Sequence, residues 1–140
     1  MVPVVGSDTR RVSPIDHSSP VAVVRVYDES REPGVHRVLV DRLWPRGVTR
    51  DAAALDEWCA DLAPSTGLRR WYGHDPARFA EFSRRYRAEL TRPPASDVVT
   101  RLLAIAATRP VALVTATRDV EHSGARVLRD HLVQRLGAHR

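Results

Sequence analysis

Three short segments rich in β-branched residues stand apart from longer segments in which apolar residues recur at helical spacing. Residues 21–27, 37–41 and 111–115 are bounded by proline, glycine or charged residues, and this pattern predicts three β-strands. The unbroken Val-Leu-Val of residues 38–40 indicates a strand that is buried on both faces, as in a parallel sheet with helices on each side.

Helical periodicity accounts for most of the remaining chain. Apolar residues at spacings of three and four predict helices over residues 51–62, 66–71, 76–90, 96–108 and 122–136. Asp75, which precedes Pro76, and Ser96 further on are the expected N-terminal caps of two of these helices. The segment 51–62 also fits a strand through Trp58, Ala60 and Leu62, so its secondary structure stays open at this point.

With the short helix 66–71 left out, the order β-β-α-α-α-β-α predicts the α/β class. Strands separated by helical segments need crossover connections, so we expect a parallel or mixed sheet of three or more strands with helices on both faces. This single small domain is expected over residues 20–138. Residues 1–19 mix Pro, Ser, Asp and Gly without a hydrophobic period, and we expect them to form a disordered leader.

Polar and charged residues follow two of the predicted strands. The second strand ends in Asp-Arg-Leu-Trp-Pro-Arg-Gly at residues 41–47, and the third ends in Thr-Ala-Thr-Arg-Asp at residues 115–119. Ligands of parallel sheets bind outside the carboxyl ends of the strands. If the two strands are neighbours, both loops line one crevice, and that crevice is the predicted site.

The charge of the chain comes from arginine alone. All 22 basic residues are arginine and the net charge is +5, so lysine Schiff-base chemistry and a lysine phosphate clamp are excluded. The positive excess is compatible with nucleic acid or phosphorylated ligands. Acidic and basic residues are interspersed, which favours a solvated surface for most of this charge.

The apolar runs, the N-terminus and the cysteine count exclude further classes of protein. The longest strongly apolar runs have about half a dozen residues, whereas a membrane-spanning helix needs about 20. The N-terminus lacks the pattern of a secretory signal, so we expect a cytoplasmic protein without membrane partners. Cys59 is the single cysteine, which excludes a disulfide within the monomer and a cysteine-based zinc site, and we expect it to be structural.

Arg42 and Arg46 flank a Trp-Pro step directly after the second strand. Guanidinium groups bind phosphate or carboxylate through two hydrogen bonds and stack on indole rings, so a ligand contact is one interpretation. In the other interpretation Arg42 pairs with Asp41 or another carboxylate, and Trp44 packs under a loop. The residues alone leave both interpretations open.

His74 directly precedes the predicted helix that Asp75 caps. An imidazole in this position could act as a general acid or base or contact an anion, or simply form a hydrogen bond within the loop.

Asp119 and His122 have a spacing that is a weak metal signal, and we predict no metal site. The chain has no hydrolase nucleophile elbow, glycine-rich phosphate loop or dinucleotide fingerprint, and it identifies no cofactor.

The candidate site residues form two groups. The candidates for proton transfer are His74, Asp41 and Asp119. The candidates for ligand binding are Arg42, Trp44, Arg46, Trp71, Tyr72, Thr115, Arg118 and His122.

Residues 26–136, about four-fifths of the chain, closely resemble the YeaO-like branch of the bacterial domain of unknown function 488. The matching segments are residues 39–47, Trp58, 61–65, 68–69, 71–76, Phe82, 85–86, 89–90, 113–114, 118–119 and His122. The resemblance implies a small cytoplasmic α/β protein without an established activity. Ser123 and Gly124 stand where members of the family usually carry Asn, so an amide contact there is not carried over.

The function that we expect is binding of an anionic small molecule, such as a nucleotide or a phosphorylated metabolite, in the strand-end crevice. An enzyme and a binding protein both fit the candidate residues. The first alternative is a nucleic-acid-binding or regulatory module that uses Arg84, Arg85 and Arg87 on one helix. The second alternative is a protein-interaction domain without catalysis.

Overall fold

The computed structural model describes residues 20–28 and 32–138, so the predicted leader, residues 1–19, lies outside the described residues. Four parallel strands form one sheet in the order β1-β4-β2-β3: β1 Val21–Arg25, β2 His36–Leu39, β3 Glu57–Trp58 and β4 Val111–Thr115. The α-helices are α2 Arg50–Ala53, α3 Thr66–Tyr72, α4 Phe79–Leu90, α5 Ala95–Ala106 and α6 Gly124–Ala138. Short 3₁₀ turns occupy Ala60–Leu62, Pro76–Arg78 and Val120–His122. The predicted α/β class with a parallel sheet is therefore confirmed.

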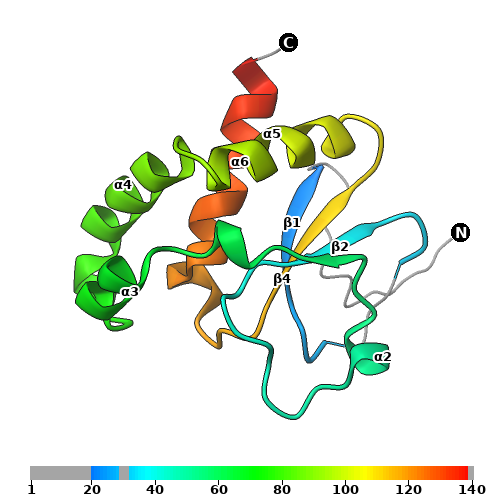
Figure 1. The fold of residues 1–140 in the computed structure, drawn as a ribbon, viewed down its shortest axis with the longest axis horizontal. Helices are drawn as coiled ribbons and strands as arrows, with labels where there is room; N and C mark the ends of the chain where they lie inside the picture. Colours follow the sequence, from blue (N-terminus) through cyan, green and yellow to red (C-terminus); the bar gives the residue numbers. More distant parts are fainter. Residues whose placement is uncertain (1–19, 29–31, 139–140) are drawn as a thin grey trace, which may run out of the picture.

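Strand β4 lies in the middle of the sheet between β1 and β2 (Figure 1). Leu39 of β2 is in register with Val114 of β4, and both strands run in the same direction. The condition set by the sequence, that these two strands are neighbours, is met. The loops that follow β2 and β4 consequently leave the sheet side by side at its carboxyl edge.

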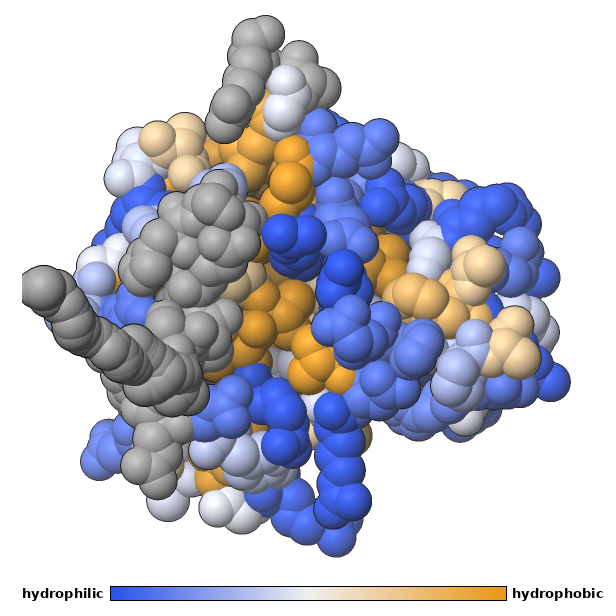
Figure 2. Space-filling model, turned by 180° about the vertical axis from the view of Figure 1, so that it is seen from behind, coloured by the Kyte–Doolittle hydropathy of each residue, from blue (hydrophilic) through white to orange (hydrophobic). Residues whose placement is uncertain are grey.

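Most of the helical mass covers one face of the sheet, and α2 lies apart from it (Figure 1). Because side chains alternate along a strand, Val38 and Leu113 point into the main core beneath α3 to α6. Leu39 and Val114 point to the opposite face, where they pack with Ala53 of α2. Seen from behind, apolar side chains gather over the middle of the molecule, and hydrophilic side chains cover the helical half (Figure 2).

The helix predicted over residues 51–62 was wrong in its length, because only its first turn, α2, forms. The helix ends after Ala53, because Ala54 adopts the left-handed conformation with φ of 49°. Trp58 then pairs with Leu39 of β2, and the Cys59 amide donates to the Leu39 carbonyl at 2.8 Å. The open edge of β2 offers these backbone hydrogen bonds, and this tertiary pairing overrides the helical spacing of the apolar residues. The alternative strand is correct at Trp58, but Ala60 and Leu62, which it was also expected to include, belong to a 3₁₀ turn.

Three other helix boundaries differ from those expected, and one of them is the start of α4 at Phe79, which follows a 3₁₀ turn over Pro76–Arg78. Ser96 was predicted as an N-cap, but α5 already begins at Ala95 and Pro94 occupies the cap position. The final helix begins at Gly124, because residues 120–122 form a 3₁₀ turn first. The predicted cap at Asp75 is confirmed, since its carboxylate accepts a hydrogen bond from the Ala77 amide at 3.0 Å. Within the described part of the chain, none of the helices has the length and apolar character needed to cross a membrane.

Candidate functional site

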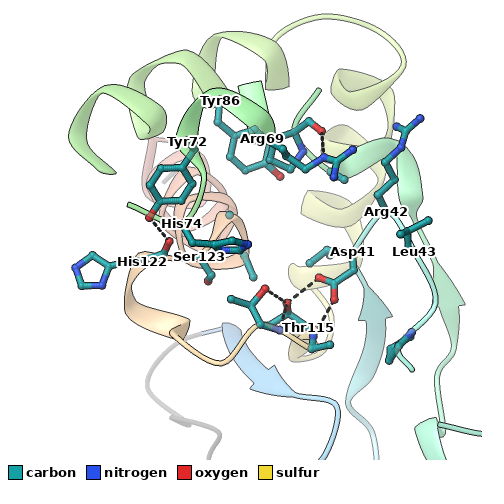
Figure 3. A pocket seen from close by; sticks show the side chains of 18 of the residues that line it. Asp41, Arg42, Leu43, Arg69, Tyr72, His74, Tyr86, Thr115, His122 and Ser123 are labelled. Carbon is teal, nitrogen blue, oxygen red and sulfur yellow. Dashed lines mark hydrogen bonds between the residues drawn. The ribbon is translucent and has the colours of Figure 1, made fainter. Parts of the chain in front are cut away.

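A cavity of about 600 Å³ opens at the carboxyl edge of the sheet (Figure 3). We call it the arginine cavity. Its walls come from the loop after β2, from the segment that contains α3, from α4, and from the chain between β4 and α6. The predicted crevice between the two strand-end loops is therefore present. The lining residues include eight of the candidates: Asp41, Arg42, Trp44, Arg46, Tyr72, His74, Thr115 and His122.

Asp41 joins the two strand-end loops to each other. Its Oδ1 accepts a hydrogen bond from the Thr115 hydroxyl at 2.7 Å, and its Oδ2 accepts one from the Ala116 amide at 2.8 Å (Figure 3). Thr115 is buried, so its hydroxyl proton needs an acceptor within the protein. The carboxylate and hydroxyl predicted as site residues thus serve first to fix the cavity wall.

Four arginines line the arginine cavity, whereas Asp41 is the single carboxylate among its lining residues. The guanidinium groups of Arg42, Arg46 and Arg70 form no hydrogen bond or ion pair with any other described residue. Arg69 is held in place, because it donates from Nε to the Pro64 carbonyl at 3.2 Å and from Nη2 to Thr66. Four cations around a single carboxylate give the cavity a positive potential.

Arg69 and Arg70 were absent from the candidates drawn from the sequence. They lie on α3, whose N-terminus is capped by Ser65 through a hydrogen bond from the Leu68 amide at 3.2 Å. Ser65 is itself held by Glu89 of α4, which accepts from its amide at 2.8 Å and from its hydroxyl at 2.6 Å. The signal that could have revealed Arg69 is its place in the segments shared with the YeaO-like branch.

Buried aromatic rings form the helical wall of the arginine cavity. Tyr72 and Phe82 stack with their ring centroids 4.1 Å apart, and Phe82 stacks in turn on Tyr86. The Tyr72 hydroxyl donates to the His122 carbonyl at 2.6 Å, and the Tyr86 hydroxyl donates to the Leu62 carbonyl. Burial raises the pKa of both phenols, so they stay neutral. This wall offers a ligand mainly apolar surface.

His74 lies between Tyr72 and Asp41 in the close view of the cavity (Figure 3). It follows Gly73, and both residues have left-handed backbone, with φ of 56° at His74 and 54° at Gly73. This conformation costs a residue other than glycine about 1–2 kcal/mol. The imidazole is exposed and forms no hydrogen bond with another residue of the described chain. Strained, unpaired groups of this kind cluster at binding and catalytic sites.

Trp71 lies outside the arginine cavity. Its ring is contacted by the guanidinium groups of Arg78, 5.3 Å from the ring centroid, and Arg85, 4.5 Å from it. It is not among the residues that line the cavity, whereas its neighbour Tyr72 is. The two side chains leave the last turn of α3 in different directions, because successive helical residues are about 100° apart.

Trp44 lies in the cavity wall but has a full set of protein contacts. Its Nε1 donates to the Val48 carbonyl at 2.6 Å, and its ring meets the edge of the Trp58 ring at 5.6 Å. Arg50 lies over the same indole at 5.5 Å. The interpretation in which Trp44 packs under its own loop agrees with these contacts.

His122 contributes its backbone to the arginine cavity, while its imidazole points away (Figure 3). The ring meets Phe79 edge-on at 5.2 Å, and its Nδ1 lies 2.8 Å from the Asp119 carboxylate. Asp119 and Arg118 do not line the arginine cavity. They line a second, neighbouring cavity of about 480 Å³, which also includes His74 and Asp41.

Among the described residues, no group of three His, Cys, Asp or Glu side chains has the arrangement needed for a metal ion.

Cys59 is buried, and its thiol donates to Glu57 Oε1 at 3.2 Å. Burial, followed by the neighbouring Glu57 carboxylate, raises the pKa of the thiol to about 11. A thiol in this state is a poor nucleophile, in line with the structural role expected from the sequence.

The basic face of α4 is partly neutralised. Glu81 accepts hydrogen bonds from Arg84 at 2.5 Å and from Arg85 at 2.7 Å. Arg87 donates to Gln134 of α6 at 2.7 Å. These arginines were the basis of the nucleic-acid alternative, and each has a partner within the protein.

A family model described as "Inactive DUF488-N3 subclade" matches residues 20–140. An uncharacterized protein of Mycobacterium tuberculosis is 44% identical over 108 residues, which cover 77% of this chain and 89% of that protein. The uncharacterized protein YeaO of Escherichia coli is 38% identical over 108 residues, which cover 77% of this chain and 92% of YeaO. No solved structure gives a significant match. These matches confirm the predicted resemblance, and the chain belongs to the YeaO-like DUF488 family, in the subclade described as inactive DUF488-N3.

Proposed function

We propose that this protein binds an anionic small molecule in the arginine cavity and does not transform it. The observation that carries the proposal is the set of three unpaired guanidinium groups, Arg42, Arg46 and Arg70, around one cavity. The single lining carboxylate, Asp41, already accepts two hydrogen bonds from the protein. Its charge therefore offsets only part of the positive potential.

The energetics favour a phosphate or carboxylate group as the anion. A hydrogen bond to a charged group contributes about 1.5–3 kcal/mol, and the planar guanidinium forms two such bonds with one phosphate or carboxylate. The volume of about 600 Å³ lies within the usual range of small-molecule sites. The apolar wall of Tyr72, Phe82 and Tyr86 would cover an uncharged part of the same ligand. A nucleotide or a phosphorylated metabolite meets both requirements.

The side chains proposed for proton transfer argue for binding without turnover. Asp41 is engaged with Thr115 and Ala116, and Asp119 is engaged with His122. In the part of the chain that the structure describes, His74 has no hydrogen-bonded carboxylate that would orient it as a general base. The family description "Inactive" points in the same direction.

Thermal unfolding against nucleotides, sugar phosphates and inorganic phosphate tests this proposal. A ligand that binds only the folded protein stabilises it by about 2.7 kcal/mol at 100 times its Kd, so a binding anion should raise Tm clearly. The double variant Arg42→Ala, Arg46→Ala should lose this increase while keeping its circular dichroism spectrum. Arg92→Ala is the matched control, because Arg92 is exposed and lines neither cavity.

Two binding results and one activity result would contradict the proposal. One is the same increase in Tm for wild type and the double variant, which would place the anion elsewhere. The other is stabilisation by oligonucleotides alone, lost as salt is raised, which would favour the nucleic-acid alternative. Turnover of any stabilising ligand would remove the claim that binding is not catalytic.

A further inference from the structure

A second cavity of about 480 Å³ lies next to the arginine cavity. Four residues line both cavities: Asp41, His74, Ala116 and Thr117. The two cavities are therefore contiguous, and these four residues form their common boundary. The second cavity adds Arg118 and Asp119, which follow the end of β4.

Arg118 gives the second cavity a cation of its own. Its side chain is exposed and has no hydrogen bond or ion pair with any other residue in the described ranges. The adjacent Asp119 carboxylate lines the same cavity but does not form an ion pair with Arg118, because its Oδ2 lies 2.8 Å from Nδ1 of His122. The Thr117 side chain and the unpaired His74 imidazole add polar groups at the boundary.

The boundary itself carries a negative charge. Asp41 is fixed there by the Thr115 hydroxyl and the Ala116 amide, so it cannot turn away from a ligand that passes it. An anionic group beside this carboxylate would be repelled, whereas a neutral group would not. Unpaired guanidinium groups consequently lie on both sides of a boundary that disfavours negative charge.

We propose that the two cavities form one bipartite site for a ligand with two anionic groups joined by an uncharged spacer. One group would contact Arg42, Arg46 and Arg70, and the other would contact Arg118. The spacer would pass Asp41 and His74. This inference rests on the proposed function, because it assigns the second half of the ligand that the arginine cavity binds.

Calorimetric titration with two series of probes tests the inference on the full chain. The first series is linear alkanediol bisphosphates of increasing chain length, and the second is the alkyl monophosphates of the same lengths. The bisphosphates should bind about tenfold more tightly at one optimal length, because one further guanidinium–phosphate contact contributes at least about 1.4 kcal/mol. Shorter and longer spacers should lose this advantage.

Substitution of Arg118 separates the two halves of the site. In Arg118→Ala the bisphosphates should bind only as well as the monophosphates, and monophosphate affinity should not change. Arg118→Lys keeps the charge and should retain part of the advantage. Arg92→Ala should leave both series unaffected, since Arg92 lies outside both cavities.

These experiments distinguish failure of the bipartite site from failure of the proposed function. Equal affinity of wild type for both series, or an equal loss for both series in Arg118→Ala, would overturn the bipartite site. If monophosphate binding then still depended on Arg42 and Arg46, the proposed function would stand alone. Absence of binding by either series to wild type would overturn both proposals.

Discussion

Single residues decide whether the strand-end loops hold their positions, and Asp41 is the first of them. Replacing it with Ala leaves the Ala116 amide without its acceptor and leaves the buried Thr115 hydroxyl with only the Thr117 hydroxyl, 3.2 Å away. Loss of a partner for a buried polar group costs about 1–3 kcal/mol, so we expect the free energy of unfolding to fall by about 2 kcal/mol. Asp41→Asn retains both hydrogen bonds if its carbonyl accepts from Ala116 and its amide donates to Thr115, and it should cost less than about 1.5 kcal/mol.

Urea denaturation of the two variants and wild type measures this difference. Equal destabilisation by Asn and Ala would show that the charge of Asp41 matters more than its hydrogen bonds. Unchanged stability in both variants would show that Asp41 does not hold the loops together. Either result would weaken the argument that Asp41 is first a structural residue of the cavity.

His131 is a second single residue with a predicted effect, because it makes the free energy of unfolding depend on pH. It is buried on α6 and its Nε2 has no hydrogen-bond partner within the described structure. Burial, followed by the charges of Arg87 and Arg135, lowers the pKa of this imidazole. The unfolded chain therefore binds a proton more readily than the folded protein once the pH falls below about 6.5. Stability contributed by the neutral ring is present above that pH and is lost as the solution becomes more acidic.

We expect His131→Leu to flatten the fall in the free energy of unfolding as the pH drops below about 6.5, relative to wild type, because the leucine does not titrate. Urea midpoints for both proteins across this range provide the measurement. A pH dependence that is the same in variant and wild type would contradict the role assigned to His131. A steeper dependence in the variant would contradict the sign of the effect.

Among the elements, β3 is the least predictable from the sequence and the most dependent on tertiary contacts. Two residues of a parallel edge strand carry too little local pattern to outweigh the helical spacing around them. Glu57 accepts from Arg101 of α5 at 2.9 Å and lies 2.5 Å from Nε2 of His36 in β2. These contacts between segments far apart in the chain specify the strand. Longer strands such as β4, whose five residues are all buried, could be predicted from the sequence.

Replacing Arg101 with Ala should loosen β3. The side chain of Arg101 is about half exposed, so we expect a loss of only about 1 kcal/mol at neutral pH. The Arg101 hydrogen bond holds the pKa of Glu57 at about 2, so its contribution is present above pH 4.5 and disappears as the pH falls toward 2. Wild type and variant should therefore differ at pH 7 and converge near pH 2.

Hydrogen exchange and urea denaturation check this expectation together. The Cys59 amide, which donates to Leu39, should exchange faster in Arg101→Ala than in wild type. Arg92→Ala should change neither measurement. Equal exchange at Cys59 in all three proteins would show that the ion pair does not hold the edge strand.

For the whole molecule, the sequence predicted the cavity at the strand ends but not all of the residues that line it. The strand ends predicted a crevice between residues 41–47 and 115–119, and β2 and β4 do lie side by side. Arg70 could not be placed in advance, because its position depends on how α3 packs against α4. Trp71 was predicted to offer a stacking face in the site, but the orientation of α3 turns it toward Arg85 of α4 instead.

The most direct test of an anion site in the arginine cavity is nuclear magnetic resonance of the arginine side chains during a titration with inorganic phosphate. Each guanidinium Nε–H group gives its own signal, so the arginines that contact the anion can be identified one by one. We expect saturable shifts of the Nε–H signals of Arg42, Arg46 and Arg70. We expect none for Arg84 or Arg85, which already donate to Glu81. Shifts confined to Arg84 and Arg85 would contradict this expectation and would move the anion site to the surface of α4.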